Sequence, residues 1–169
     1  MERTVKVLNQ MKSERVILNY ALGGAVAALF YMEPIETHDL DVFISLPPRQ
    51  TKLLLNLEYI STKGYVPKED HVLVEGVPVQ FLVASTPLVE EAMSEATELN
   101  YGSQKVAVMK PEHLVAIMVE MNRPKDRVRL GLFLDQVSVD LQRLRAILKA
   151  QSLQKKWKRI LREIGYEVG

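Results

Sequence analysis

The fold is decided by two short stretches, LGGAVAALF at residues 22–30 and THDLDVFI at residues 37–44. A glycine pair opens the first stretch, and the apolar, alanine-rich run behind it is typical of a helix start. The second stretch reads as a strand in which Asp39 and Asp41 are two residues apart. Because strand side chains alternate between faces, both carboxylates are predicted to point the same way. Leu40, Val42 and Ile44 are predicted to point the other way, into a core.

Asp39 and Asp41 place two like charges on one half-buried face, where they repel each other. The commonest reason to keep such a pair is a cation between them, and hard carboxylate oxygens suit magnesium or manganese. The alternative is a pair of solvated acids on an edge strand. The apolar run Val42–Ile44 favours a more central strand and therefore the metal.

Gly23 and Gly24 allow two interpretations. At a helix N-terminus, glycine lets the backbone approach a phosphate closely, and the free N–H groups and the helix dipole favour anions. The same pair also serves in a tight turn that needs a positive φ. With the two aspartates downstream, the phosphate role is the prediction.

The glycine pair followed by Asp-x-Asp on an apolar strand resembles the signature of the nucleotidyltransferase superfamily, the fold of DNA polymerase β. The resemblance covers about residues 15 to 160 and is nearest to small, toxin-like members of the abortive-infection type. Residues 77–83 stand where this family has its third strand. Residues 111–114 (PEHL) and 123–127 (RPKDR) are similar to the segments that follow in the small members.

The expected fold is α+β, with a nucleotidyltransferase-like mixed sheet flanked by helices and a C-terminal helical segment. Residues 1–110 would form the α/β core and residues 111–169 the helical segment, packed on the core as one compact unit. Hydrophobic periodicity and turn residues predict the elements. Predicted helices cover 5–12, 25–31, 51–64 and 87–98, with helices from 111 to the end broken at Arg123-Pro124. Predicted strands cover 16–22, 37–45, 65–74, 77–83 and 105–109, with a hairpin turn at Glu75-Gly76.

The resemblance also implies an activity, the transfer of a nucleotidyl group from a nucleoside triphosphate to an acceptor. The acceptor is open between RNA, a protein and a small molecule. Asp39 and Asp41 would be the metal ligands of a two-ion magnesium or manganese site, and they would be catalytic together with Gln80. Nucleotide binding is implied for five residues: Gly23, Gly24, Thr37, Lys125 and Arg127.

Two positions depart from the family pattern. Gln80 stands where a third carboxylate is usual, and a neutral amide can ligate a metal but cannot act as a general base. Met118 stands where small members carry a lysine, and at helical spacing it is interpreted as core. These departures support an alternative function, a catalytically weakened nucleotidyltransferase-fold binding module or one component of a toxin–antitoxin pair.

The remaining charges and histidines carry less information. Residues 1–100 hold 8 Lys/Arg against 14 Asp/Glu, and residues 101–169 hold 14 against 7. This division suits acids that hold metal and bases that hold phosphates, or two halves that attract each other as they pack. The three histidines are His38, His71 and His113, and none has metal-ligand spacing.

Composition excludes several classes of protein. The chain has no cysteine, which rules out disulfides and thiol chemistry and is compatible with a cytoplasmic location. Residues 1–12 have mixed charge and lack the apolar core of a signal peptide, and no run has the length of a membrane span, so no membrane partner is expected. The oligomeric state is left open.

Overall fold

The computed structural model describes residues 1–33, 37 and 39–166. Within this part of the chain, six strands form one mixed sheet in the order β3-β4-β2-β1-β6-β5. The strands are β1 (Asn19–Leu22), β2 (Leu40–Ser45), β3 (Val72–Val74), β4 (Val77–Val83), β5 (Thr97–Tyr101) and β6 (Gln104–Val108). The pairs β2/β4 and β1/β6 are parallel, and the other neighbours are antiparallel.

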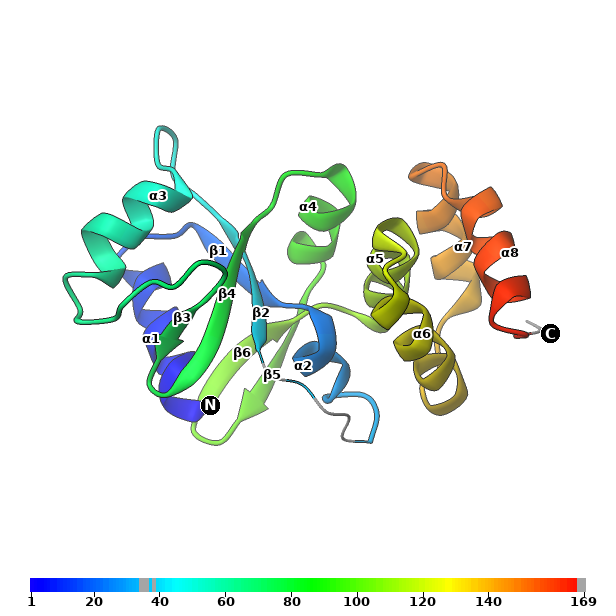
Figure 1. Ribbon diagram of the computed structural model, residues 1–169, viewed down its shortest axis with the longest axis horizontal. Coiled ribbons are helices and arrows are strands. Elements are labelled where there is room, and N and C mark those ends of the chain that lie inside the picture. Colours follow the sequence, from blue (N-terminus) through cyan, green and yellow to red (C-terminus); the bar gives the residue numbers. More distant parts are fainter. Residues whose placement is uncertain (34–36, 38, 167–169) are drawn as a thin grey trace.

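Helices flank this sheet and then continue beyond it. The helices are α1 (Glu2–Ser13), α2 (Gly24–Ala28), α3 (Lys52–Leu54) with the π-helix η1 (Leu55–Ile60), α4 (Pro87–Ser94), α5 (Pro111–Met121), α6 (Pro124–Gln136), α7 (Leu141–Ala150) and α8 (Gln154–Glu163). In Figure 1, α1 and α3 lie on the side of the sheet remote from the C-terminus, and α5 to α8 gather at the opposite end of the molecule. Helices α2 and α4 lie between, and both contact α5. The mixed sheet with flanking helices confirms the predicted fold class.

Strand β2 has a central position, with β1 on one side and β4 on the other. Its alternation is as predicted, since Leu40, Val42 and Ile44 are buried in the core while Asp41 and Phe43 on the other face are half-buried. The alternative interpretation, a pair of solvated acids on an edge strand, is therefore wrong for Asp41. Asp39 lies just before the strand, because β2 begins at Leu40 and not at Thr37.

The largest error in the predicted elements concerns residues 87–98. Helix α4 begins as expected, with Pro87 in its first turn and the Thr86 hydroxyl accepting a hydrogen bond from the Val89 amide, but it ends at Ser94. The chain then forms β5, which pairs with β6 through a turn at Gly102, whose φ is +59°. The alternating exposure of β5 carries a two-residue period that the acidic, helix-like composition of the segment obscures.

Other boundaries moved by less. The hairpin at Glu75-Gly76 is confirmed, with φ values of +53° and +80° joining β3 to β4. The strand predicted over 65–74 is reduced to β3 and one isolated bridge between Pro67 and Val72. The first predicted strand begins at Asn19, and the predicted helix 51–64 is one short α-helical turn followed by η1. Four of the residues predicted to form a loop or strand before Asp39, at 34–36 and 38, lie outside the described residues.

The predicted boundary at residue 110 falls in the short connection between β6 and α5. No helix within residues 1–33, 37 and 39–166 has the length and apolar character that crossing a membrane requires.

Candidate active site

The turn between β1 and α2 lies directly against the end of β2. The Gly23 amide donates a hydrogen bond to the carbonyl oxygen of Asp41 at 3.0 Å. Gly24 has a φ of +57°, and a Cβ built on it would lie 1.7 Å from Oδ2 of Asp41. A Cβ on Gly23 would lie 2.4 Å from Cε2 of Phe43. Both glycines are therefore required by this close approach. The Asp41 carboxylate occupies the space that a Cβ at residue 24 would fill.

Gln80 lies opposite Asp41 on the neighbouring parallel strand, where the two residues are in register. Side chains in register on adjacent strands point to the same face of the sheet. Both line a cavity of about 320 Å³ that Gly24 also borders. The cavity lies between the sheet and the C-terminal helices, since its other walls include residues of α4, α5 and α6.

The electrostatics of Asp41 are unusual for a carboxylate. Burial raises the pKa of Asp41 above its ordinary value, and the neighbouring Asp39 carboxylate raises it further. Lys125, Arg123 and Arg129 oppose these effects without cancelling them. Within residues 1–33, 37 and 39–166, the Asp41 carboxylate accepts no hydrogen bond from another side chain. A half-buried carboxylate that accepts no such hydrogen bond is stabilised when it binds a cation or a proton.

Comparison with known proteins identifies the fold in which this site lies. No protein-family model and no curated protein matches the sequence. Among solved structures, an antigenic nucleotidyltransferase-like protein from Paracoccidioides brasiliensis is similar at 17% identity and a TM-score of 0.57, covering 96% of this chain and 92% of that protein. The antibiotic-resistance factor ANT(2'')-Ia is similar at 12% identity in two structures, one in solution (TM-score 0.52, covering 92% of this chain and 95% of that one) and one crystal complex with adenylyl-2''-tobramycin (0.53, 93% and 99%).

The chain has the nucleotidyltransferase fold. At these identities the comparison establishes the architecture alone. Function must therefore be inferred from the residues that this chain places at the site.

The nucleotidyltransferase fold brings together most, but not all, of the residues singled out in the sequence. Asp39 is half-buried and close enough to Asp41 to raise its pKa. The hydroxyl of Thr37 donates to the carbonyl oxygen of Asp39 at 3.2 Å, so Thr37 orders the backbone that leads to the strand. Lys125 is exposed at the start of α6, within electrostatic reach of Asp41.

Arg127 has other partners. One of its terminal nitrogens lies 3.0 Å from Oε2 of Glu163 on α8, and its Nε donates to Asn122 at 2.9 Å. Arg127 is also absent from the cavity wall. Its predicted nucleotide contact stays a prediction, and it would require these two interactions to open.

Arg129 is the residue that sequence reasoning missed. It is half-buried, lines the cavity and lowers the pKa of Asp41. Lys125 and Arg129 are one helical turn apart on α6. Their i, i+4 spacing after Pro124 could have indicated that Arg129 lies on the same face as Lys125. Arg123 also borders the cavity, but its guanidinium binds the buried Asp126 carboxylate through two hydrogen bonds of 2.8 and 3.0 Å.

Met118 was interpreted as core, and the structure confirms this in part, because Met118 packs against the hydrophobic core from a position that also faces the cavity. The side chain is half-buried and lines the cavity together with Met32 and Met121. Methionine is flexible and polarisable, and it adapts to irregular apolar surfaces. The position therefore contributes to the wall of the candidate site and brings no positive charge to it.

The donor set fits a magnesium or manganese ion. Asp41 and Gln80 place a carboxylate and an amide at the cavity wall, and Asp39, which does not line the cavity, acts electrostatically on Asp41. Carboxylate and amide oxygens are the hard ligands that such ions prefer. The missing Cβ at Gly24 lets Oδ2 of Asp41 lie against the backbone of the turn, at the wall of the cavity. Burial, and then repulsion from Asp39, raise the pKa of Asp41, and a bound cation would oppose both effects.

Proposed function

We propose that this chain is a metal-dependent nucleotidyltransferase that moves a nucleotidyl group from a nucleoside triphosphate to an acceptor hydroxyl. The observation that carries the proposal is the Asp41 carboxylate, half-buried against Gly24 and in register with Gln80 at the wall of a cavity. The nucleotidyltransferase fold supports it.

In this proposal each residue has a defined task. Asp39 and Asp41 hold Mg²⁺ or Mn²⁺, in a two-ion arrangement, with Gln80 able to add an amide oxygen. The bound metal supplies Lewis-acid stabilisation of phosphate oxygens in an in-line displacement. Arg129 and Lys125 neutralise the polyphosphate from the α6 side, and Gly24 gives it space to approach the sheet. Because α2 is only Gly24–Ala28, the space at the glycine counts for more than the helix dipole.

The reaction forms a bond between the acceptor oxygen and the α-phosphorus and breaks the bond to the bridging oxygen, so pyrophosphate leaves. The acceptor hydroxyl also loses a proton. Gln80 cannot accept it, and the carboxylates of Asp39 and Asp41 are committed to the metal, so the proton is released to water.

The acceptor we favour is a small molecule. The cavity is enclosed between sheet and helices, and most of its walls are apolar, including Leu82, Ile117 and Met118. ANT(2'')-Ia, which has the same fold, was crystallised with adenylyl-2''-tobramycin, a nucleotidylated small molecule. RNA and protein acceptors are the competing outcomes of an acceptor screen.

The proposal is tested by calorimetric titration of each nucleoside triphosphate into the chain with Mg²⁺, followed by measurement of pyrophosphate release with small-molecule, RNA and protein acceptors. We expect one nucleotide to bind with Mg²⁺ and to be consumed with at least one acceptor class. A chain that binds no nucleotide in either Mg²⁺ or Mn²⁺ would overturn the proposal.

A second function, nucleotide binding without turnover, is favoured by Gln80 specifically. The substitution Gln80→Asp distinguishes transfer from binding without turnover, because it places next to Asp41 a charged group that can ligate metal and accept a proton. A positioned base contributes about 10²–10⁴-fold, and we expect this unrefined one to raise the transfer rate by about tenfold. Gln80→Asn is the matched control, since it has the size of aspartate without the charge. Turnover that appears only in Gln80→Asp would identify the natural chain as a binding module.

Arg129→Met is expected to weaken Mg²⁺–nucleotide binding by about 10–100-fold, because one charge-assisted hydrogen bond contributes about 1.5–3 kcal/mol. Calorimetry or KM for the nucleotide measures the change. Arg127→Met on the same helix tests the other predicted nucleotide contact, and it should cause a smaller loss because that guanidinium is paired with Glu163. An equal loss in both variants would show that Arg127 leaves Glu163 to bind the nucleotide.

A further inference from the structure

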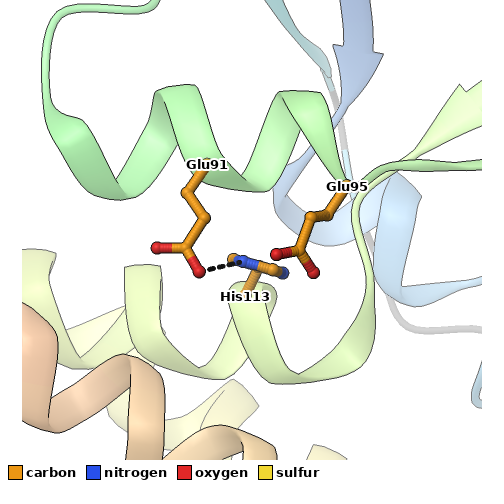
Figure 2. Close-up of side chains that lie close together, drawn as sticks. All are labelled: Glu91, Glu95 and His113. Carbon is orange, nitrogen blue, oxygen red and sulfur yellow. Dashed lines mark ion pairs between the residues drawn. The ribbon is translucent and has the colours of Figure 1, made fainter.

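A second group of metal-ligand side chains lies between α4 and α5, outside the wall of the cavity that holds Asp41. It consists of Glu91 in α4, Glu95 at the C-terminal cap of α4, and His113 in the first turns of α5. Figure 2 shows the imidazole of His113 facing both carboxylates. One ligand atom from each residue lies within 4.8 Å of the others.

The buried His113 is the observation that points to a ligand. Its side chain is 0% exposed, and within the described residues neither ring nitrogen has a hydrogen-bond partner. Its Nε2 lies 3.6 Å from Oε1 of Glu91, which is too long for a hydrogen bond. Buried polar atoms are nearly always satisfied, so an orphan imidazole that faces two carboxylates needs an explanation. Burial also lowers the pKa of His113, which keeps the ring in the neutral form that binds metals.

We propose that Glu91, Glu95 and His113 bind a divalent transition-metal ion, for which Zn²⁺ is the best match. One imidazole nitrogen and two carboxylate oxygens are a common zinc donor set, and a water completes the tetrahedron. At zinc bond lengths the ligand atoms lie roughly 3.4 Å apart, so rotation of the two glutamate side chains must bring them inward by about 1 Å. The ion would join α4 to α5, and so the sheet to the C-terminal helices.

Arg143 on α7 is the competitor for this site. One of its terminal nitrogens lies 2.6 Å from Oε1 of Glu91 and also contacts Oε1 of Glu95. Lys110 adds a second positive charge, with Nζ 3.6 Å from Oε2 of Glu95. The metal and Arg143 use the same oxygens and have charges of the same sign, so Arg143 must withdraw when the metal binds. Removing Arg143 should therefore strengthen metal binding.

The experiment is a Zn²⁺ titration of the full chain by calorimetry, with Co²⁺ absorption as a report of tetrahedral coordination. The chain carries Asp39→Asn and Asp41→Asn, so the candidate active site contributes no carboxylate ligand. We expect one Zn²⁺ per chain and a loss of affinity of at least 10–100-fold in Glu91→Gln and His113→Asn. Arg143→Met is expected to tighten binding. Glu90→Gln, an exposed neighbour on the same helix, is the matched control and should bind as the parent does.

A second measurement guards against variants that misfold. Zn²⁺ should raise the Tm of the parent and of Glu90→Gln, and should leave the Tm of folded Glu95→Gln unchanged. Absence of Zn²⁺ binding to the parent, equal binding in Glu91→Gln and His113→Asn, or weaker binding in Arg143→Met would each overturn the proposal. The result does not depend on nucleotidyl transfer, because the assay uses no nucleotide.

Discussion

Replacing Asp41 by asparagine is expected to lower the rate of nucleotidyl transfer on the order of 10³-fold while the chain stays folded. A metal ion contributes several kcal/mol of charge stabilisation to the transition state, and each 1.36 kcal/mol corresponds to about tenfold in rate. Asparagine keeps the size of the side chain and its fit against Gly24, but it removes the charge that holds the metal. Single-turnover kinetics with saturating Mg²⁺ and nucleotide measure the effect.

The same substitution should stabilise the metal-free protein. Burial, and then the Asp39 carboxylate, raise the pKa of Asp41, so the folded chain retains a proton that the unfolded chain releases. The stability from this linkage is fully present below the unfolded pKa, near 4, and is lost as the pH rises through the folded pKa. Asp41→Asn has no such loss. Its Tm without divalent ions should therefore exceed that of the wild type at pH 7, and the difference should shrink under acid conditions.

Asp135→Asn is the control for both effects, because Asp135 is exposed on α6 and outside the cavity wall. It should change neither the rate nor the Tm. Full activity in Asp41→Asn would exclude this carboxylate as a metal ligand. A lower Tm in metal-free Asp41→Asn would show that the charge is compensated in the folded state.

The parts of the fold that follow from local patterns could be predicted from the sequence. The alternation of Leu40, Val42 and Ile44 depends only on the two-residue period of a strand, and the structure buries all three. The Glu75-Gly76 turn was indicated by a glycine, which tolerates positive φ, between two apolar runs. Strand β5 was missed because it needs β6 as a partner, and that pairing outweighs the helix-like composition of Glu95 to Glu98.

The candidate site shows the same division between local and long-range information. That Gly24 and Asp41 belong to the candidate site was anticipated because each lies in a short sequence motif, and the pairing of β1 with β2 brings the two together. The meeting of His113 with Glu91 and Glu95 was not, since it depends on how α4 packs on α5. Arg129 lies about ninety residues from Asp41 in sequence, and only the packing of α6 brings it to the cavity. Spacing rules act within an element and do not report such contacts.

Gly24→Ala is expected to destabilise the chain by about 2–5 kcal/mol and to lower transfer by at least about 10²-fold. About 1–2 kcal/mol comes from placing alanine at a φ of +57°. The rest comes from the new Cβ, 1.7 Å from Oδ2 of Asp41, because overpacking costs about 1–3 kcal/mol. The displaced carboxylate accounts for the lost activity, since a shift of about 1 Å can cost about 10²-fold. Urea unfolding and the transfer assay measure the two effects.

Gly76→Ala isolates the backbone contribution. Gly76 has a φ of +80°, and a Cβ there would meet nothing within 4 Å, so only the cost of about 1–2 kcal/mol is expected. The steric contribution is isolated by adding Gly24→Ala to Asp41→Ala, which removes the atoms nearest to the new Cβ apart from the Cβ of Asp41 at 3.0 Å. The cost of Gly24→Ala should fall toward that of Gly76→Ala in this background. An unchanged cost would mean that Gly24 is kept for its backbone conformation alone, and the space beside Asp41 would lose its significance as a metal and phosphate site.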